Sequence, residues 1–282
     1  MFHGYTQNME NNKTVLDYYE ANSEDQRLYT IHQIEFIRTK EIIARYLPDR
    51  PIRIIDLCGA VGHYAYWLAE MGHEVHLLDL SPRHIEKAQE NRKKYNADLK
   101  NIETGDARSI KYKDETFDMV LLMGALYHLQ AREDRIQCLS EAHRILKNGG
   151  IAVFAYISRF APLMESFQNG RIQDPQKQIA VEQELYDGKH TNPEKNPVDF
   201  TTAYFHSTDE IYTELLQTKF KDIVLYAVEG FARLIDKEAY LHDEKKLKTL
   251  LYNIGLIEQN MELMGMSDHK LAVCKKQGSR AG

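Results

Sequence analysis

The sequence predicts an α/β protein built on a doubly wound, mostly parallel sheet. Between residues 52 and 157, apolar runs of strand length alternate with capped or amphipathic helical segments. The run at 117–123 is apolar almost throughout, which is typical of a strand covered by helices on both sheet faces. Strands and helices that alternate in this way form parallel sheets, and such sheets bind ligands beyond the carboxyl ends of their strands.

The N-terminal region reads as helical over residues 13–46. Val15, Tyr18 and Tyr19 form one apolar stripe at helical spacing, and a second stripe follows it. Pro48 lies just beyond the segment and ends it. We expect this segment to be a helical cover on the domain that follows.

The first half of the sheet has clear start and stop signals. A strand at 52–57 leads into a helix that starts near Gly62, and Gly72 follows that helix in the position usual for a terminating glycine. Ser81 and Pro82 form an N-cap and first turn that open the next helix, which runs to about residue 95.

The next elements continue the alternation. They are a strand near 100–104, the strand at 117–123, a helix with its buried face at Ile136, Leu139, Ala142 and Leu146, a stop at Asn148–Gly150, and a strand at 151–157.

The pattern changes after Ser158. Residues 159–206 are largely polar, contain four prolines and show little regular period. A structureless loop of this length is uncommon in a compact domain, so we expect a partly helical cap. The remaining elements are a helix opened by the capping box Ser207–Glu210 and running to about Thr218, a strand at 221–228, two helices within 233–264, and a last strand at 269–275.

These elements divide the chain into four parts. They are an N-terminal helical segment that covers the core (1–47), the core itself (48–158), an inserted cap or lid (159–206), and the rest of the core (207–282) with a helical insertion at about 233–264.

The turn after the first strand indicates a nucleotide site. Asp56 stands where the strand becomes a turn of small residues, and about twenty residues later a second apolar run ends in Asp79. A dinucleotide fold needs three glycines in this turn to hold a pyrophosphate, but Cys58, Ala60 and His63 occupy those positions. A nucleoside ligand without pyrophosphate, such as S-adenosylmethionine, asks less of the turn, and Asp79 can accept hydrogen bonds from its ribose.

From about Asp56 to Tyr156 the chain resembles a class I S-adenosylmethionine-dependent methyltransferase of the small-molecule type. The segments that carry the resemblance, in the family's order, are Asp56–Gly62, Leu78–Pro82, Gly105–Ala107, Phe117–Leu129 and Glu141–Gly150. The resemblance implies a seven-stranded sheet whose final two strands form an antiparallel pair. The family usually has glycine where Cys58 and Ala60 stand, and both replacements are small.

The resemblance also implies which residues hold the cofactor and its product, S-adenosylhomocysteine. They are Tyr19, Arg27, Asp56, Cys58, Gly59, Ala60, Gly62, Asp79, Leu80, Asp106, Ala107, Met123, Gly124 and Tyr127. For Tyr18, Tyr19 and Arg27, amphipathic packing of the N-terminal helix is the alternative. Asp118, at the start of a strand on the far edge, is expected to be structural.

The residues expected at the methyl acceptor are Tyr18, Tyr156, Arg159, Tyr204 and His206. Arg159 suits a substrate carboxylate, or an acid of the cap. Methyl transfer is a direct displacement that needs alignment and exclusion of water, and a hydroxyl or protonated amine also needs a base. His128 and His206 are the candidate bases. The alternatives are that His128 hydrogen-bonds backbone under its loop and that His206 is a structural cap.

Composition narrows the partners of the chain. The net charge is −6, with 36 Lys and Arg against 42 Asp and Glu, and no basic stripe suits a nucleic acid. The strand-end segment also lacks the Asn/Asp-Pro-Pro-aromatic signature of base N-methylating relatives. We therefore expect a small-molecule acceptor, with methyl transfer to O or N and S as an option.

Further expectations concern metal, location and assembly. Cys58, Cys138 and Cys274 are far apart, and His63, His73 and His76 lack partners at ligand spacing, so no metal is predicted. No apolar run could span a bilayer and no signal-peptide core is visible, which predicts a cytoplasmic protein, monomeric or homodimeric. Two alternatives stay open: an RNA methyltransferase, and a non-catalytic regulatory protein that binds S-adenosylmethionine.

Overall fold

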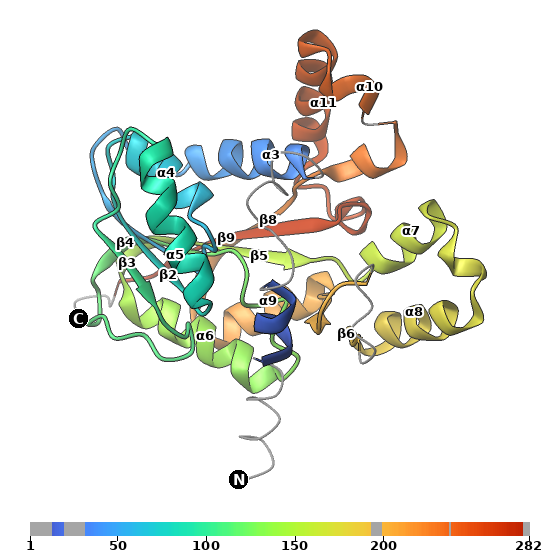
Figure 1. Cartoon of the computed structure of the whole chain (residues 1–282), viewed down its shortest axis with the longest axis horizontal. Helices are drawn as coiled ribbons and strands as arrows, with labels where there is room; N and C mark the ends of the chain where they lie inside the picture. The colour runs from blue at the N-terminus through green and yellow to red at the C-terminus, as the bar shows by residue number, and fades with distance from the viewer. Residues whose placement is uncertain (1–12, 20–31, 193–198, 237, 279–282) are drawn as a thin grey trace.

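One sheet organises the molecule in the computed structural model, which describes residues 13–19, 32–192, 199–236 and 238–278. Its strands are β1 (Arg53–Leu57), β2 (Glu74–Asp79), β3 (Asn101–Thr104), β4 (Phe117–Leu122), β5 (Leu146–Ile157), β8 (Phe220–Ala227) and β9 (His269–Lys276). They lie side by side in the order β3-β2-β1-β4-β5-β9-β8 (Figure 1). The predicted fold class is confirmed.

The direction of the last strands matters for the site. β1 to β5 pair in parallel, whereas β9 runs antiparallel to both β5 and β8. His269 at the start of β9 therefore pairs with Ile157 at the end of β5. The chain enters its last strand at the edge where the parallel strands end.

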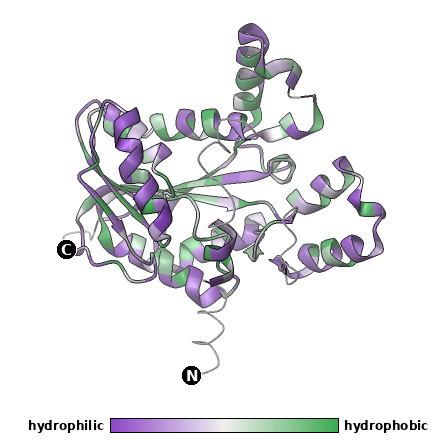
Figure 2. Ribbon diagram, viewed as in Figure 1, coloured by the Kyte–Doolittle hydropathy of each residue, from purple (hydrophilic) through white to green (hydrophobic). Residues whose placement is uncertain are grey.

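Helices cover both faces of the sheet. One face carries α3 (Gln33–Ala44), α4 (His63–Glu70) and α5 (Pro82–Asn91), and the other carries α6 (Arg132–Ile145) and α9 (Thr208–Gln217). Each helix presents apolar residues to the sheet and polar residues outward, so hydrophobic and hydrophilic residues alternate along the ribbons in Figure 2.

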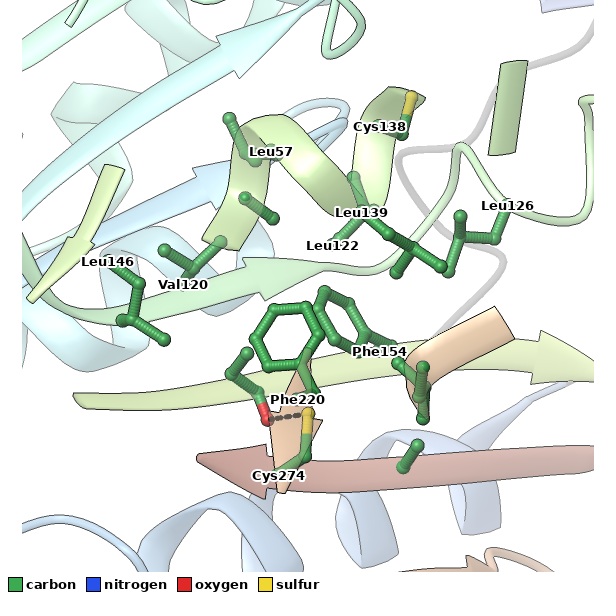
Figure 3. Packing of buried hydrophobic residues seen from close by; sticks show 14 of the residues in the cluster. Leu57, Val120, Leu122, Leu126, Cys138, Leu139, Leu146, Phe154, Phe220 and Cys274 are labelled. Carbon is green, nitrogen blue, oxygen red and sulfur yellow. Dashed lines mark hydrogen bonds between the residues drawn. The ribbon is translucent and has the colours of Figure 1, made fainter. Parts of the chain in front are cut away.

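The apolar core below α6 and α9 is densely packed. Phe154 of β5 and Phe220 of β8 meet with ring centroids 5.1 Å apart in an edge-to-face arrangement. Leu122 and Leu139 lie close above them in Figure 3. Burial of such side chains contributes about 1.5–3 kcal/mol each, which makes this layer a rigid base for the loops at the strand ends.

The predicted caps are present in the structure. Ser81 accepts a hydrogen bond from the His84 N–H, and Ser207 and Glu210 form a reciprocal capping box at α9. One boundary was wrong: α6 ends at Ile145 and β5 begins at Leu146, before the glycines that were expected to stop the helix. Residue 146 already pairs with Phe117, and a bulge in the register absorbs Gly149, whose φ is +78°.

The segment that begins after Ser158 folds as two helices on a short stem. These are α7 (Ala161–Gln168) and α8 (Pro175–Asp187), joined by the 3₁₀ turn η2 (Arg171–Gln173), and they extend away from the sheet in Figure 1. The short strands β6 (Lys189–His190) and β7 (Ala203–Tyr204) pair, and Ser158 bridges to His206. The cap thus leaves and rejoins the core at one point.

A second group of helices follows β8. The 3₁₀ helix η3 (Gly230–Leu234) leads to α10 (Glu238–Leu241) and α11 (Glu244–Ile257), two helices where the sequence expected them. Ile34 of α3 packs against Leu250 and Ile254 of α11, so the N-terminal region and this insertion share a small core. None of the helices in the described residues has both the length and the apolar content needed to cross a bilayer.

Candidate functional site

The turn after β1 has an unusual backbone. Cys58 and Ala60 have positive φ values of 57° and 48°, the left-handed region that glycine occupies without penalty. These are the two positions where the family usually has glycine. The backbone of the turn is therefore kept although the glycines are not, at a cost of about 1–2 kcal/mol per residue.

Asp79 at the end of β2 holds this turn. One of its carboxylate oxygens accepts from the Ala60 N–H at 2.9 Å, and the other accepts from the Ser81 N–H at 2.9 Å and contacts His84 Nδ1 at 3.1 Å. The carboxylate is thus fixed by groups on either side of it.

A cavity lies over this carboxylate, and we call it the Asp79 cavity. Its volume is about 150 Å³, and its wall is mainly apolar. The predicted cofactor residues on the wall are Tyr19, Cys58, Ala60, Asp79, Leu80, Asp106, Ala107, Gly124 and Tyr127. The helical segment at 13–19 also contributes Val15 and Leu16, so the N-terminal region covers this cavity.

Asp106 on this wall is paired within its own turn. Its carboxylate accepts from the backbone N–H and the guanidinium of Arg108. Burial favours the neutral acid, but the hydrogen bonds and charge of Arg108 outweigh it, so the pKa of Asp106 lies below its usual value. Arg108 also reaches Asp134 of α6. Asp106 is therefore a charged, oriented acceptor at the cavity.

Glycine is required where chain segments cross closely. A Cβ on Gly59 would lie 2.4 Å from Leu77 Cδ1 and 2.5 Å from Asp56 Cγ, and one on Gly124 would lie 3.1 Å from the Cys58 carbonyl oxygen. Gly62 has φ +86° and is the N-cap of α4. Gly124 lies on the wall of the Asp79 cavity, whereas Gly62 does not.

Asp56 lies beneath the turn and is fully buried. Within the described part of the chain, neither carboxylate oxygen has a hydrogen bond of normal geometry, although the Ala65 N–H lies near enough to lower the pKa in part. Burial, and then the charge of Asp79, raise the pKa of Asp56 to about 8. Asp56 was expected to face the ligand, but it does not lie on the wall of the Asp79 cavity.

A second cavity of about 100 Å³ adjoins the first, and we call it the Tyr64 cavity. The two share Cys58, Ala60 and Tyr127. The predicted residues Gly59 and Met123 lie on its wall. The partly buried Cys58 thiol lies between the two, and desolvation raises its pKa well above the usual value, which favours the neutral thiol.

A third and larger cavity of about 640 Å³ lies below the cap, and we call it the cap cavity. It shares Glu35, Ile157, Phe200 and His269 with the Tyr64 cavity. The predicted residue Tyr18 lies on its wall. The three cavities thus form a row along the carboxyl edge of the sheet, from β2 to β9.

His128 follows β4 and closes the Asp79 cavity. Its Nε2 lies 2.8 Å from the Tyr19 hydroxyl, and its Nδ1 lies 3.4 Å from the Thr202 carbonyl oxygen. The N-terminal helix and the end of the cap therefore meet at this histidine. The Tyr127 hydroxyl donates to the Met123 carbonyl at 3.0 Å and stiffens the same loop.

Four predicted acceptor residues lie away from the three cavity walls. Tyr156 and His206 are fully buried, and burial lowers the pKa of His206. Its Nε2 lies 3.6 Å from Glu214, whose carboxylate binds the buried Arg135. The sequence-based expectation is therefore corrected for His206, because its side chain belongs to the interior below the cap stem.

Arg159 and Tyr204 belong to the same interior network. Arg159 donates to Glu210 at 2.6 Å and to the Phe205 carbonyl at 2.7 Å, and the Tyr204 hydroxyl donates to Glu210 at 2.7 Å. The guanidinium carbon of Arg135 lies 3.7 Å from the centroid of the Tyr204 ring. Of the two roles expected for Arg159, binding a substrate carboxylate or pairing with an acid of the protein, the structure has the second. Arg27 lies outside the described residues.

The structure brings together a charged cluster that the sequence analysis did not identify. His269 Nδ1 binds Glu229 at 2.5 Å and lies 3.6 Å from Glu35, which in turn binds His32 at 2.9 Å. Atoms of His32, Glu35 and His269 lie within 4.8 Å of one another, the kind of set that can hold a metal ion. The antiparallel direction of the last strand was the signal that could have placed His269 at this edge.

Comparison with known proteins identifies the core. Residues 55–154 match the family described as "methyltransferase domain". The chain is 30% identical over 123 residues to 2-methyl-6-phytyl-1,4-hydroquinone methyltransferase 1, chloroplastic, of Oryza sativa subsp. japonica, an alignment that covers 43% of this chain and 36% of that protein. It is 29% identical over 102 residues to the glycine/sarcosine N-methyltransferase of Aphanothece halophytica, with 36% and 38% covered. The chain thus spans less than half the length of these relatives.

A solved structure extends the likeness to the whole fold. A Thermotoga maritima S-adenosylmethionine-dependent methyltransferase, described as a possible histamine N-methyltransferase, superposes with a TM-score of 0.57 at 18% identity and covers 93% of this chain and 99% of that one. At this identity the likeness speaks for the fold alone. Residues 55–154 thus contain a methyltransferase domain, and the chain as a whole has the fold of an S-adenosylmethionine-dependent methyltransferase.

Proposed function

We propose that the protein transfers a methyl group from S-adenosylmethionine to O or N, with S as an option, of a small molecule bound in the cap cavity. The observation that carries the proposal is the row of three adjoining cavities along the sheet edge. Such a row offers separate room for a nucleoside, for its amino-acid tail and for an acceptor. The cap over the row supports exclusion of water.

The residues of the first two cavities fit the cofactor. Asp79 offers a fixed carboxylate to the ribose hydroxyls, Leu80 and Ala107 offer apolar contacts to the adenine, and the turn around Gly59 leaves room for the tail. When bound, the cofactor supplies an electrophilic methyl group on a sulfonium. The task left to the protein is alignment of the acceptor and removal of its proton.

His128 is the candidate base on the cofactor side. Its Nε2 and the Tyr19 hydroxyl lie within hydrogen-bond distance at the wall of the Asp79 cavity, so the two groups can share a proton. If His128 rather than a histidine of the cap cavity removes the proton, His128→Ala should lower kcat by about 100-fold, within the range of general-base catalysis, and change cofactor affinity much less. Steady-state kinetics and calorimetry on this variant measure both quantities. Normal turnover would remove His128 from the mechanism.

The experiment that tests the function combines binding with turnover. Calorimetry with S-adenosylmethionine should show binding, and release of S-adenosylhomocysteine should appear with some small amine, alcohol, phenol or thiol from a metabolite panel. Turnover on RNA alone would favour the alternative of an RNA methyltransferase. Binding without turnover on either class would favour a regulatory protein, and no binding would contradict both enzyme proposals.

The cellular location, the assembly and the metal requirement of the protein are predictions from the sequence. The spacing of Cys58, Cys138 and Cys274 favours a reducing compartment, and we therefore propose a cytoplasmic enzyme, monomeric or homodimeric. We also keep the prediction that the displacement needs no metal, which the cluster at His269 makes worth testing.

A further inference from the structure

His269 stands where the Tyr64 cavity meets the cap cavity. It lies on the walls of both, whereas His128 lies on the wall of the Asp79 cavity. Its position at the start of β9, opposite Ile157, places it at the carboxyl edge of the sheet. An acceptor that fills the cap cavity therefore meets His269 as it approaches the cofactor side.

Glu229 fixes the orientation of the His269 ring. One carboxylate oxygen takes the Nδ1 hydrogen, and the other accepts from the His269 backbone N–H at 3.0 Å and from the Ser267 hydroxyl at 2.8 Å. With Nδ1 as the donor, the lone pair of the neutral ring is at Nε2. Among the described residues Nε2 has no hydrogen-bond partner, yet it is not one of the polar atoms that are fully buried without a partner. This nitrogen is open to the cavity.

The wall of the cap cavity is acidic. It carries seven carboxylates against three Lys and Arg side chains among the described residues. Arg171 is paired with Asp199, and Arg233 with Asp268, so those charges cancel in part. The other five carboxylates are Glu35, Glu165, Glu229, Asp236 and Glu238, of which Glu35, Glu229 and Glu238 pair with His32, His269 and His242. An excess of negative charge in a cavity attracts cations and disfavours anionic acceptors.

Resting on the proposed function, we propose that the acceptor is an amine and that His269, held by Glu229, takes the proton from its ammonium group. Glu35, 3.6 Å from His269 Nδ1, supplies the negative charge that draws the ammonium in. Glu229 is a positioning residue, because it acts through the ring that it holds.

The step balances in protons and electrons. The ammonium gives one proton to Nε2 of neutral His269, which becomes an imidazolium, and the nitrogen is left with a lone pair. That pair forms the bond to the methyl carbon of the donor. The carbon–sulfur bond breaks with its electrons going to sulfur, which turns the sulfonium into a thioether. The imidazolium then returns its proton to solvent.

The charges around His269 suit this exchange. Burial acts to lower the pKa of His269, but the carboxylates of Glu35 and Glu229 outweigh it and raise the pKa to about 9. His32 and Arg233 also face the cluster, and Asp268 lies beside it. At neutral pH a free ring with this pKa is an imidazolium, and the positive charge of a bound ammonium favours loss of its proton to solvent, which gives the neutral base.

Substitution of His269 tests the proposal. In His269→Gln we expect kcat with an amine to fall about 100-fold or more, with cofactor affinity unchanged in calorimetry. His242→Gln is the matched control, because His242 is an exposed histidine paired with Glu238, and it should keep the wild-type rate. A His269→Gln variant that binds cofactor and turns over normally would overturn the proposal.

The pH profile separates a positioning role from a structural one. In Glu229→Gln the rising limb of kcat against pH should move to lower pH, because His269 loses a carboxylate that raises its pKa. NMR of the cofactor-free protein gives a readout that needs no activity. One imidazole should titrate near pH 9, vanish in His269→Gln and titrate lower in Glu229→Gln. An unmoved profile and titration would overturn the role of Glu229.

Two further measurements, an acceptor panel and a chelation test, distinguish failure of this proposal from failure of the proposed function. The wild type should methylate amines and not the alcohols or carboxylates of matching shape. Turnover of alcohols alone would overturn the amine proposal and leave the methyltransferase intact, whereas cofactor binding without any turnover would overturn both. Loss of activity on chelation, restored by a divalent cation, would make His32, Glu35 and His269 a metal site and would also overturn the proposal.

Discussion

The two ends of the cavity row are built in different ways. At the Asp79 cavity, the carboxylate of Asp79 is held by Ala60, Ser81 and His84, all within 19 residues of it. At the cap cavity, His269 meets Glu229 and Glu35, which come from two distant parts of the chain. The carboxylate at the cofactor end is thus held by neighbouring loops, whereas His269 at the acceptor end is held by segments that only folding brings together.

This difference has a functional consequence. A site made by adjacent loops changes little when distant helices change, so one cofactor can be kept while acceptors vary. The acceptor end depends on how α3, the cap and the segment after β8 dock on the sheet, and each docking contact is a point where specificity can change. Substitutions at short-range and at long-range contacts should therefore differ in their effects on stability and on cofactor affinity.

The largest expected effect is on the long-range side. Glu214 and Arg135 are an ion pair with both side chains 2% exposed, and together they support the cap stem at His206. Glu214→Ala leaves Arg135 buried without its partner, so the free energy of unfolding should fall by about 3–5 kcal/mol. Glu244→Ala, at an exposed pair with Lys248, is the control and should cost less than about 1 kcal/mol. Similar losses of unfolding free energy in the two variants, measured with denaturant, would contradict the expected difference between the buried and the exposed ion pair.

The next effect is on the local side and concerns affinity. Asp79→Ala removes a carboxylate that both lines the cavity and holds the Ala60 N–H, so cofactor affinity should fall by about tenfold or more. Asp118→Asn, at the opposite edge of the sheet, should leave affinity unchanged. Isothermal titration on both variants is the measurement. Equal affinities would mean that the ribose lies elsewhere.

The third prediction concerns pH. Because the pKa of Asp56 is raised to about 8 in the folded state, folding favours its protonated form. Its contribution is most favourable below the unfolded pKa near 4 and is lost as pH rises from about 4 to about 8. Asp56→Asn should therefore gain stability over the wild type as pH rises through this window.

The same measurement has a control of opposite sign. Burial opposes the charged form of Asp118, but the Arg53 N–H and Lys147 outweigh it and lower its pKa. Asp118 thus stabilises the fold above its unfolded pKa, and that stability is lost as pH falls. Thermal unfolding should show the trend for Asp56→Asn between pH 4 and 8, and the opposite trend for Asp118→Asn only below about pH 4. A flat difference for Asp56→Asn would contradict the buried neutral acid.

The smallest effect is in the turn itself. Ala60→Gly relieves a left-handed backbone but adds freedom to the unfolded chain, so the net gain in unfolding free energy should be about 0.5 kcal/mol. Ala180→Gly in the exposed middle of α8 is the matched control and should lose about 1 kcal/mol. A loss at Ala60 would mean that its methyl group makes contacts worth more than the strain.

The sequence by itself determined the alternation of strands and helices, the turn after β1 and the carboxylates at the strand ends. These follow from short-range signals: apolar period, capping residues and the fixed edge at which parallel strands end. Tertiary structure alone decided that Asp56 lies under the turn, that His206 is interior and that His269 faces the cavities with Glu229 and Glu35. Burial and ion pairing between distant segments depend on how elements dock, and no local pattern records that.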